Sequence, residues 1–129
     1  MRSVAQMLAA LDPQLLPDDY VFACLAQDTD ADCVAMAPIA TFREAEGFTV
    51  VVERSRAEQA GLPVDDRFRC ITLGLNSGLD EVGLTAAVAT ALAQARISAN
   101  VIAAYHHDHV FVPADRADDA LAILRGLSS

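Results

Sequence analysis

Apolar residues recur at helical spacing along one segment in the second half of the chain, from Leu79 to Ala95. A helix over this segment collects six of them on one face, namely Leu84, Ala87, Val88, Ala91, Leu92 and Ala95. This face is narrow and rich in alanine. The pattern therefore predicts a helix that lies close against a sheet.

Candidate strands flank the predicted helix on both sides. Arg67–Leu75 precedes it, across the polar loop Asn76–Gly78, and Ile97–Tyr105 and Val110–Pro113 follow it. A last amphipathic segment carries an apolar face formed by Ala117, Ala120, Leu121, Leu124 and Leu127. The pattern after residue 65 predicts the order β-α-β-β-α.

The first half contains shorter segments. Its predicted elements are a helix over Ser3–Leu11, strands over Asp19–Ala26, Val34–Arg43 and Phe48–Glu53, and a helical turn over Arg56–Ala60. Gln27–Asp32 is acidic and polar and is expected to be an exposed loop. Glu44–Gly47 is expected to form a hairpin turn, because glycine adopts turn geometry at the lowest cost. The first half thus predicts the order α-β-β-β-α.

Together these orders predict an α+β sandwich, with a mainly antiparallel sheet and helices on one face. The second half lacks the last strand of the ferredoxin-like pattern, and Asp19–Ala26 is the simplest segment to supply it. Leu62–Asp66 is the best boundary. We therefore expect an N-terminal half over residues 1–64 and a C-terminal domain over residues 65–129.

Composition narrows the classes of function. The chain has 129 residues, 53% of them hydrophobic, and a formal net charge of −9, which fits a domain with a packed core. Its nine basic residues are all arginines and form no cluster, which argues against binding to nucleic acid or to an anionic membrane. No apolar run is long enough to span a bilayer and no signal peptide is evident, so a soluble cytoplasmic protein is expected. Cys24, Cys33 and Cys70 are odd in number and widely spaced, which favours reduced thiols.

Several stretches of the chain resemble the ACT domain family. They are Val82-Gly83-Leu84 with the alanine-rich helix, Ala95–Val101, and His109–Pro113. A narrower likeness, to small bacterial proteins of two tandem ACT-like halves, rests on Thr41–Glu44, Leu73–Ala91 and Tyr105–Pro113. The resemblance implies a ferredoxin-like (ACT-type) sandwich duplicated as two ACT-like halves. It also implies a module that binds an amino acid or another small metabolite, often across a subunit interface, and regulates a partner protein that the sequence does not identify.

The loop before the long helix combines glycine with small polar residues. Ser77 and Asp80 fit the S-x-x-D pattern of a capping box, and Asp80 alone is a second candidate for the cap. In either case the helix N-terminus offers backbone N–H groups to a ligand carboxylate. The alternative is plain helix capping without any ligand. Because ACT domains use this loop as a ligand wall, the resemblance implies a ligand site formed by Asn76, Ser77, Gly78, Asp80, Val82, Gly83, Leu84 and Asn100.

Asn100 is a polar residue in an otherwise apolar predicted strand. ACT domains often place an asparagine that touches the ligand near this position. The alternative is an exposed strand edge or a local hydrogen bond to the backbone. A buried asparagine needs hydrogen-bond partners, and at the level of the sequence both interpretations stay open.

The run His106-His107-Asp108-His109 lies between the last two predicted strands. His107 and His109 would share one face of a strand, where imidazoles suit zinc or nickel. An exposed hairpin turn is the preferred interpretation, because Asp and His tolerate turn geometry. Cys70 is expected to be a buried apolar residue rather than a nucleophile, and the chain carries no nucleotide-binding or serine-hydrolase motif.

Three functions remain, in this order. The first is a small-molecule-binding regulatory or sensor module, forming a homodimer, with no cofactor and no catalytic activity of its own. The second is a structural or protein-interaction module without a ligand. The third is a metal-binding protein or small enzyme that uses His107 and His109.

Overall fold

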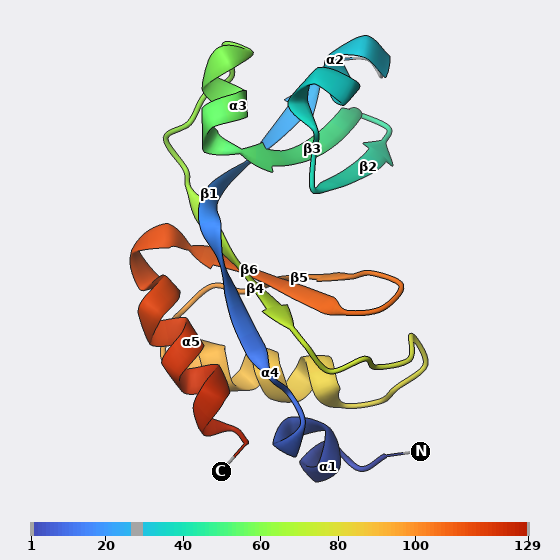
Figure 1. Ribbon diagram of the computed structural model, residues 1–129, viewed down its shortest axis with the longest axis vertical. Coiled ribbons are helices and arrows are strands. Elements are labelled where there is room, and N and C mark those ends of the chain that lie inside the picture. The colour runs from blue at the N-terminus through green and yellow to red at the C-terminus, as the bar shows by residue number, and fades with distance from the viewer. Residues whose placement is uncertain (1, 27–29, 129) are drawn as a thin grey trace. The chain divides into compact units, whose positions relative to one another are not determined.

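The computed structural model describes residues 2–26 and 30–128, and the chain divides into two compact units. The larger unit consists of Met1–Pro17 and Arg69–Ser129, and the smaller unit of Asp18–Phe68. Figure 1 shows the elements of both units, and each is described here by itself. These compact units are divided differently from the tandem halves expected at residues 1–64 and 65–129, whose boundary stays a prediction.

The larger unit is built mainly from the second half of the chain. Its elements are α1 (Val4–Ala9), the start of β1 (Pro13–Leu25), β4 (Phe68–Leu73), α4 (Leu84–Gln94), β5 (Asn100–Ala103), β6 (Asp108–Pro113), the 3₁₀ turn η1 (Ala114–Arg116) and α5 (Ala117–Gly126). The strands lie in the order β1-β4-β6-β5, which is the ferredoxin-like order with β1 as its fourth strand. The expected extra strand is present, but the start of β1, from Pro13, forms it. The predicted segment Asp19–Ala26 lies in the smaller unit, where residues 20–25 of β1 pair with β3, so the choice of segment was wrong.

Helices α4 and α5 cover one face of this sheet, as Figure 1 shows. The core beneath them joins residues of α4, α5, β4 and β6 with those of α1 and the residues that follow it. Its members include Met7, Leu11, Ile71, Leu73, Leu84, Val88, Leu92, Val110, Val112, Ala117, Ala120 and Leu124. Each buried aliphatic side chain of this kind contributes about 1.5–3 kcal/mol, so the apolar stripe identified in the sequence holds α4 in place.

The smaller unit carries a second set of similar elements. They are the rest of β1, then α2 (Asp30–Met36), β2 (Ala40–Glu44), β3 (Gly47–Glu53) and α3 (Arg54–Gln59). Strands β2, β3 and β1 are antiparallel neighbours, and the hairpin turn lies where the sequence predicted it, with Glu44 paired to Gly47. A Cβ atom at Gly47 would lie 2.6 Å from Cys24 Sγ, so only glycine fits here without movement.

The prediction of a strand over Val34–Arg43 is wrong. Residues up to Met36 form the end of α2, and β2 begins at Ala40. Pro38 is the physical reason for this break, because a residue that precedes proline avoids the helical region. Of the expected loop over residues 27–32, residues 27–29 lie outside the described residues, and Asp30 already begins α2.

This correction makes the duplication of the chain clearer. The order β1-α2-β2-β3-α3 is followed by β4-α4-β5-β6-α5, so both parts repeat β-α-β-β-α. The order α-β-β-β-α that the sequence predicted for the first half missed α2. Helix α1, which precedes both repeats, begins as expected, with Ser3 and Gln6 forming a capping box.

The assignment of the inner face of α4 can be tested at Leu92, which is fully buried. Leu92→Asp places an unpaired carboxylate in the core and is expected to cost on the order of 4 kcal/mol or more, against a total stability of about 5–15 kcal/mol. Circular dichroism should show an unfolded or strongly destabilised chain. Ala93→Asp, at an exposed position of the same helix, is the matched control. A Leu92→Asp chain with the wild-type melting temperature would contradict the assignment.

Candidate functional site

The segment after β4 is tied to the N-terminal part of the chain by its backbone. The Gly74 N–H donates to Asp12 O at 2.9 Å, and the Leu75 N–H donates to Leu11 O at 3.1 Å. The approach is so close that a Cβ atom at Gly74 would lie 2.5 Å from Asp12 Oδ2. The loop that leads to α4 therefore starts from a fixed position.

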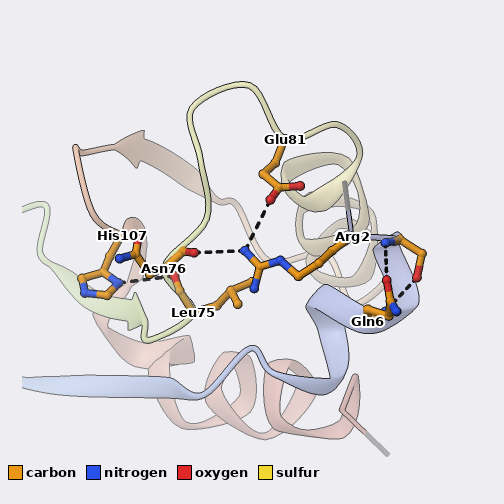
Figure 2. A network of polar contacts seen from close by, with 7 residues as sticks. Arg2, Gln6, Leu75, Asn76, Glu81 and His107 are labelled. Atoms are coloured by element: carbon orange, nitrogen blue, oxygen red, sulfur yellow. Dashed lines mark hydrogen bonds and ion pairs between the residues drawn. The ribbon is translucent and has the colours of Figure 1, made fainter.

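The side chains of Arg2 and His107 hold the loop further along, as Figure 2 shows. Nη2 of Arg2 donates to Asn76 O at 3.0 Å and to Glu81 Oε1 at 3.3 Å. On the other side, Nδ1 of His107 lies 3.3 Å from Leu75 O. The loop is thus positioned from both sides by residues distant in the sequence.

Helix α4 begins at Leu84, later than the sequence suggested. Gly83 is its N-cap, with φ of 99°, and within the described part of the chain no side chain caps the helix. The predicted capping box of Ser77 and Asp80, with a helix starting near Asp80–Val82, is therefore wrong. The reason is tertiary: a Cβ atom at Gly83 would lie 2.7 Å from Cγ2 of Val4, so α1 packs against the point where the helix begins.

The loop forms one wall of an open cavity of about 470 Å³. The residues that line it are Asn76, Ser77, Gly78, Leu79, Asp80, Tyr105 and His106. Four of the predicted site residues are thus brought together: Asn76, Ser77, Gly78 and Asp80. The opposite wall was missed. It consists of the exposed Tyr105 and the neighbouring ring of His106, whose centroid lies 4.9 Å away.

A smaller cavity of about 80 Å³ shares part of the same loop. It is lined by Ser77, Gly78, Leu79, Glu81, Leu84, Thr85, Ala103 and Asp108. Oε2 of Glu81 is buried and has no hydrogen-bond partner among the residues that the structure describes. Glu81 was not identified from the sequence, because an acidic residue in a loop gives no signal of burial. Asp108 was considered only as part of the histidine turn, whereas it begins β6.

Three predicted residues have other surroundings. Val82 is 71% exposed, and Gly83 lies against α1. Asn100 is exposed at the start of β5, where it pairs with Phe111, and it lines neither of these two cavities. A buried role for Asn100 is therefore excluded, and a contact with a ligand at this exposed strand stays a prediction.

A chain of polar side chains runs across the neighbouring strands β4 and β6. Thr72 Oγ1 lies 3.0 Å from Nδ1 of His109, and Thr72 also forms a side-chain hydrogen bond with Cys70. Burial raises the pKa of the Cys70 thiol to about 11, so this thiol is protonated at neutral pH. A protonated, fully buried thiol is a poor nucleophile, which agrees with the interpretation of Cys70 from the sequence.

His107 and His109 form hydrogen bonds with different partners. His109 lies on β6 and not in the turn, and His107 bonds toward the loop after β4. Across residues 2–26 and 30–128, no three His, Cys, Asp or Glu side chains are grouped so that they could hold a metal ion. None of the helices in those ranges has the length and apolar character needed to cross a membrane.

Two successive β-α-β-β-α repeats define a tandem ferredoxin-like protein, and comparison with known families agrees. ACT domain models match the chain twice, over residues 1–69 and over residues 64–126. The chain therefore belongs to the ACT domain family, whose members are typically small-molecule-binding regulatory modules and generally not catalytic. A search of curated proteins found no match.

Several solved structures are similar to this chain. A protein of unknown function from Vibrio cholerae, described as a possible transport protein, is 48% identical over 93% of this chain and 92% of its own, with a TM-score of 0.84. A protein from Agrobacterium tumefaciens is 19% identical over 90% of this chain and 87% of its own, with a TM-score of 0.71. The ligand-free regulatory subunit of aspartate kinase from Thermus thermophilus is 16% identical over 92% and 97%, with a TM-score of 0.64. The last two show a common fold alone.

The polar chain around His109 predicts a pH dependence of stability. Burial lowers the pKa of His109 below its ordinary value of 6.5, and a charge on His107 lowers it further, while Asp108 opposes both. Below pH 6.5 the unfolded chain therefore binds a proton more readily than the folded chain does. The free energy of unfolding consequently decreases as the pH is lowered. The wild type should lose more stability between pH 7 and pH 5 than His109→Gln, measured by chemical denaturation.

The control for this experiment is His106→Gln, at an exposed position in the same turn region. It should keep the pH dependence of the wild type. Equal slopes for the wild type and His109→Gln would show that His109 does not contribute to the effect.

Proposed function

We propose that this chain is a regulatory or sensor module that binds a small molecule, most simply an amino acid, at the loop before α4. The observation that carries the proposal is the cavity of about 470 Å³ between this loop and Tyr105. Its volume falls within the range of about 300–1,000 Å³ that is usual for small-ligand sites. Because the loop is already held by Arg2 and His107, binding would require little ordering of the backbone.

The chemistry of the loop suits an amino acid. Helix α4 has an N-terminus without a side-chain cap among the described residues, and its first N–H groups favour an anion such as a ligand carboxylate. An ammonium group needs acceptors, which Asp80 and Asn76 supply in the larger cavity and the buried Oε2 of Glu81 supplies in the smaller one. For Asn100 we propose only a contact with a part of the ligand that extends beyond these two cavities.

The proposal also includes how the chain acts and where in the cell it is located. The chain acts on a partner protein rather than as an enzyme, and the three cysteines, none of them in a disulfide, fit the cytoplasm. The alternative is a structural or protein-interaction module without a ligand. Ligand binding itself separates these two functions.

Binding is tested by calorimetry with the common amino acids, each alone. At least one should bind with a melting temperature that rises with ligand concentration. Asp80→Asn should weaken the binding of that amino acid by roughly tenfold, because the hydrogen bond between the ammonium group and a charged carboxylate is replaced by one to a neutral amide. Asp118→Asn, at an exposed position of α5, is the matched control and should bind like the wild type.

A second pair of variants locates the ligand. Asn76→Ala should weaken binding without lowering the melting temperature, because its backbone carbonyl still accepts from Arg2. Asn100→Ala should weaken binding only if the ligand extends to the edge of β5. Unchanged affinity in both variants would place the ligand elsewhere, and no binding of any amino acid would favour the ligand-free alternative.

Self-association is also part of the proposal. Strand β5 ends the sheet of the larger unit and β2 that of the smaller unit, so each presents unpaired backbone groups at an edge. We expect a dimer in sedimentation velocity experiments at micromolar concentration. A monomer that persists at high micromolar concentration would contradict this expectation.

A further inference from the structure

The smaller unit contains a cavity at a place where the packing of its helices differs from that of the larger unit. Helices α2 and α3 each pack on β3, whereas α4 and α5, at the same places in the second repeat, pack against each other. Figure 1 shows α2 and α3 apart over their sheet. A cavity of about 350 Å³ lies there, lined by Leu25, Ala35, Met36, Arg56, Gln59, Ala60 and Leu62.

Five of the seven residues that line this cavity are apolar, and Arg56 and Gln59 are the two polar ones. Met36 is 5% exposed and belongs to the buried cluster of the smaller unit, and Leu25 and Leu62 pack against that cluster. The inner end of the cavity therefore suits an aliphatic chain, whose transfer from water contributes about 0.8 kcal/mol per CH₂ group.

A single cation lines the cavity among the described residues, the guanidinium of Arg56. Its Nη1 donates to Ala35 O at 3.3 Å, which holds it between α3 and the end of α2. Its Nε lies 3.4 Å from Glu53 Oε2. Both groups of this ion pair are more than one-third exposed, at 43% and 37%, so the pair is weak and a ligand can compete with it.

Carbonyl groups at the two helix ends beside the cavity already accept hydrogen bonds within the protein. The carbonyl of Ala35 accepts from Arg56 itself, and those of Cys33 and Val34 accept from the Ala37 N–H. At the end of α3 the carbonyl groups of residues 56–58 also accept backbone N–H groups. The polar side chains that line the cavity, and can donate hydrogen bonds to a ligand, are those of Arg56 and Gln59.

We propose that the cavity between α2 and α3 is a second ligand site, which binds a small aliphatic monocarboxylate. The alkyl chain lies against Met36, Leu25 and Leu62, and the carboxylate bonds to the guanidinium of Arg56, with the amide of Gln59 beside it. Planar guanidinium and carboxylate groups match in geometry and in charge. This site shares no residue with the loop before α4, and it stands or falls independently of the function proposed for that loop.

The test uses methyl NMR on the full-length chain labelled at its methionine methyl groups. The chain has three methionines, of which Met36 lines the cavity and Met7 is buried in the core of the larger unit. Titration with hexanoate should shift the Met36 signal saturably and leave the Met7 signal unchanged. Hexanol, of similar shape but without charge, should bind roughly tenfold or more weakly, because it lacks the charged hydrogen bond.

Variants of two arginines on α3 give the matched comparison. Arg56→Gln should weaken hexanoate binding by roughly tenfold or more. Arg54→Gln, at a position that does not line the cavity and pairs with Glu58, should bind hexanoate like the wild type. Both side chains lie partly in solvent, so neither variant should unfold the chain.

A third variant fills the cavity without removing the charge. Ala35→Phe should abolish the hexanoate shift of Met36, because the phenyl ring takes the space of the ligand. The backbone carbonyl that holds Arg56 remains, so the charge stays in place. The proposal would be overturned by the absence of a saturable Met36 shift in the wild type, by equal affinity for hexanoate and hexanol, or by wild-type affinity in Arg56→Gln. Preference for hexylamine over hexanoate would overturn it as well.

Discussion

The arrangement of the larger unit depends on the close approach of two backbones, at Gly74 and at Asp12. Two hydrogen bonds join these segments, from Gly74 N–H to Asp12 O and from Leu75 N–H to Leu11 O. They align the start of β1 with the end of β4, and they place α1 where Val4 packs on Gly83. The position of the loop, the start of α4 and the reach of Arg2 to Asn76 all follow from this contact.

The two repeats use the same order of elements for different packing. In the larger unit α4 and α5 close over the sheet, and the open cavity lies at the loop before α4. In the smaller unit the cavity lies between the helices themselves, with Arg56 at its rim. A duplicated ACT-type fold therefore gives this chain two cavities with different linings, for which we have proposed an amino acid at the loop and an aliphatic carboxylate between the helices.

Hydrophobic periodicity predicted the elements wherever a long segment had one consistent period. The apolar face of α4, with Val88 and Leu92 fully buried, is an example, because eleven residues give the pattern three turns to repeat. It failed at Val34–Arg43, where α2 has only seven residues and a proline separates it from a short strand. Over so few residues, the pattern of apolar positions does not distinguish a helix from a strand.

The sequence by itself determined that a glycine-containing polar loop precedes the long helix. The resemblance to ACT domains implied a ligand site there, and four of its predicted residues, Asn76, Ser77, Gly78 and Asp80, line the loop cavity. Only the tertiary structure decided what faces that wall and what holds it. Arg2 is 74 residues from Asn76 along the chain, and His107 is 32 residues from Leu75. The start of α4 was decided in the same way, since α1 and Gly83 set it rather than a capping side chain. Capping and turn patterns describe neighbours in sequence, whereas a binding site is made where distant segments pack together.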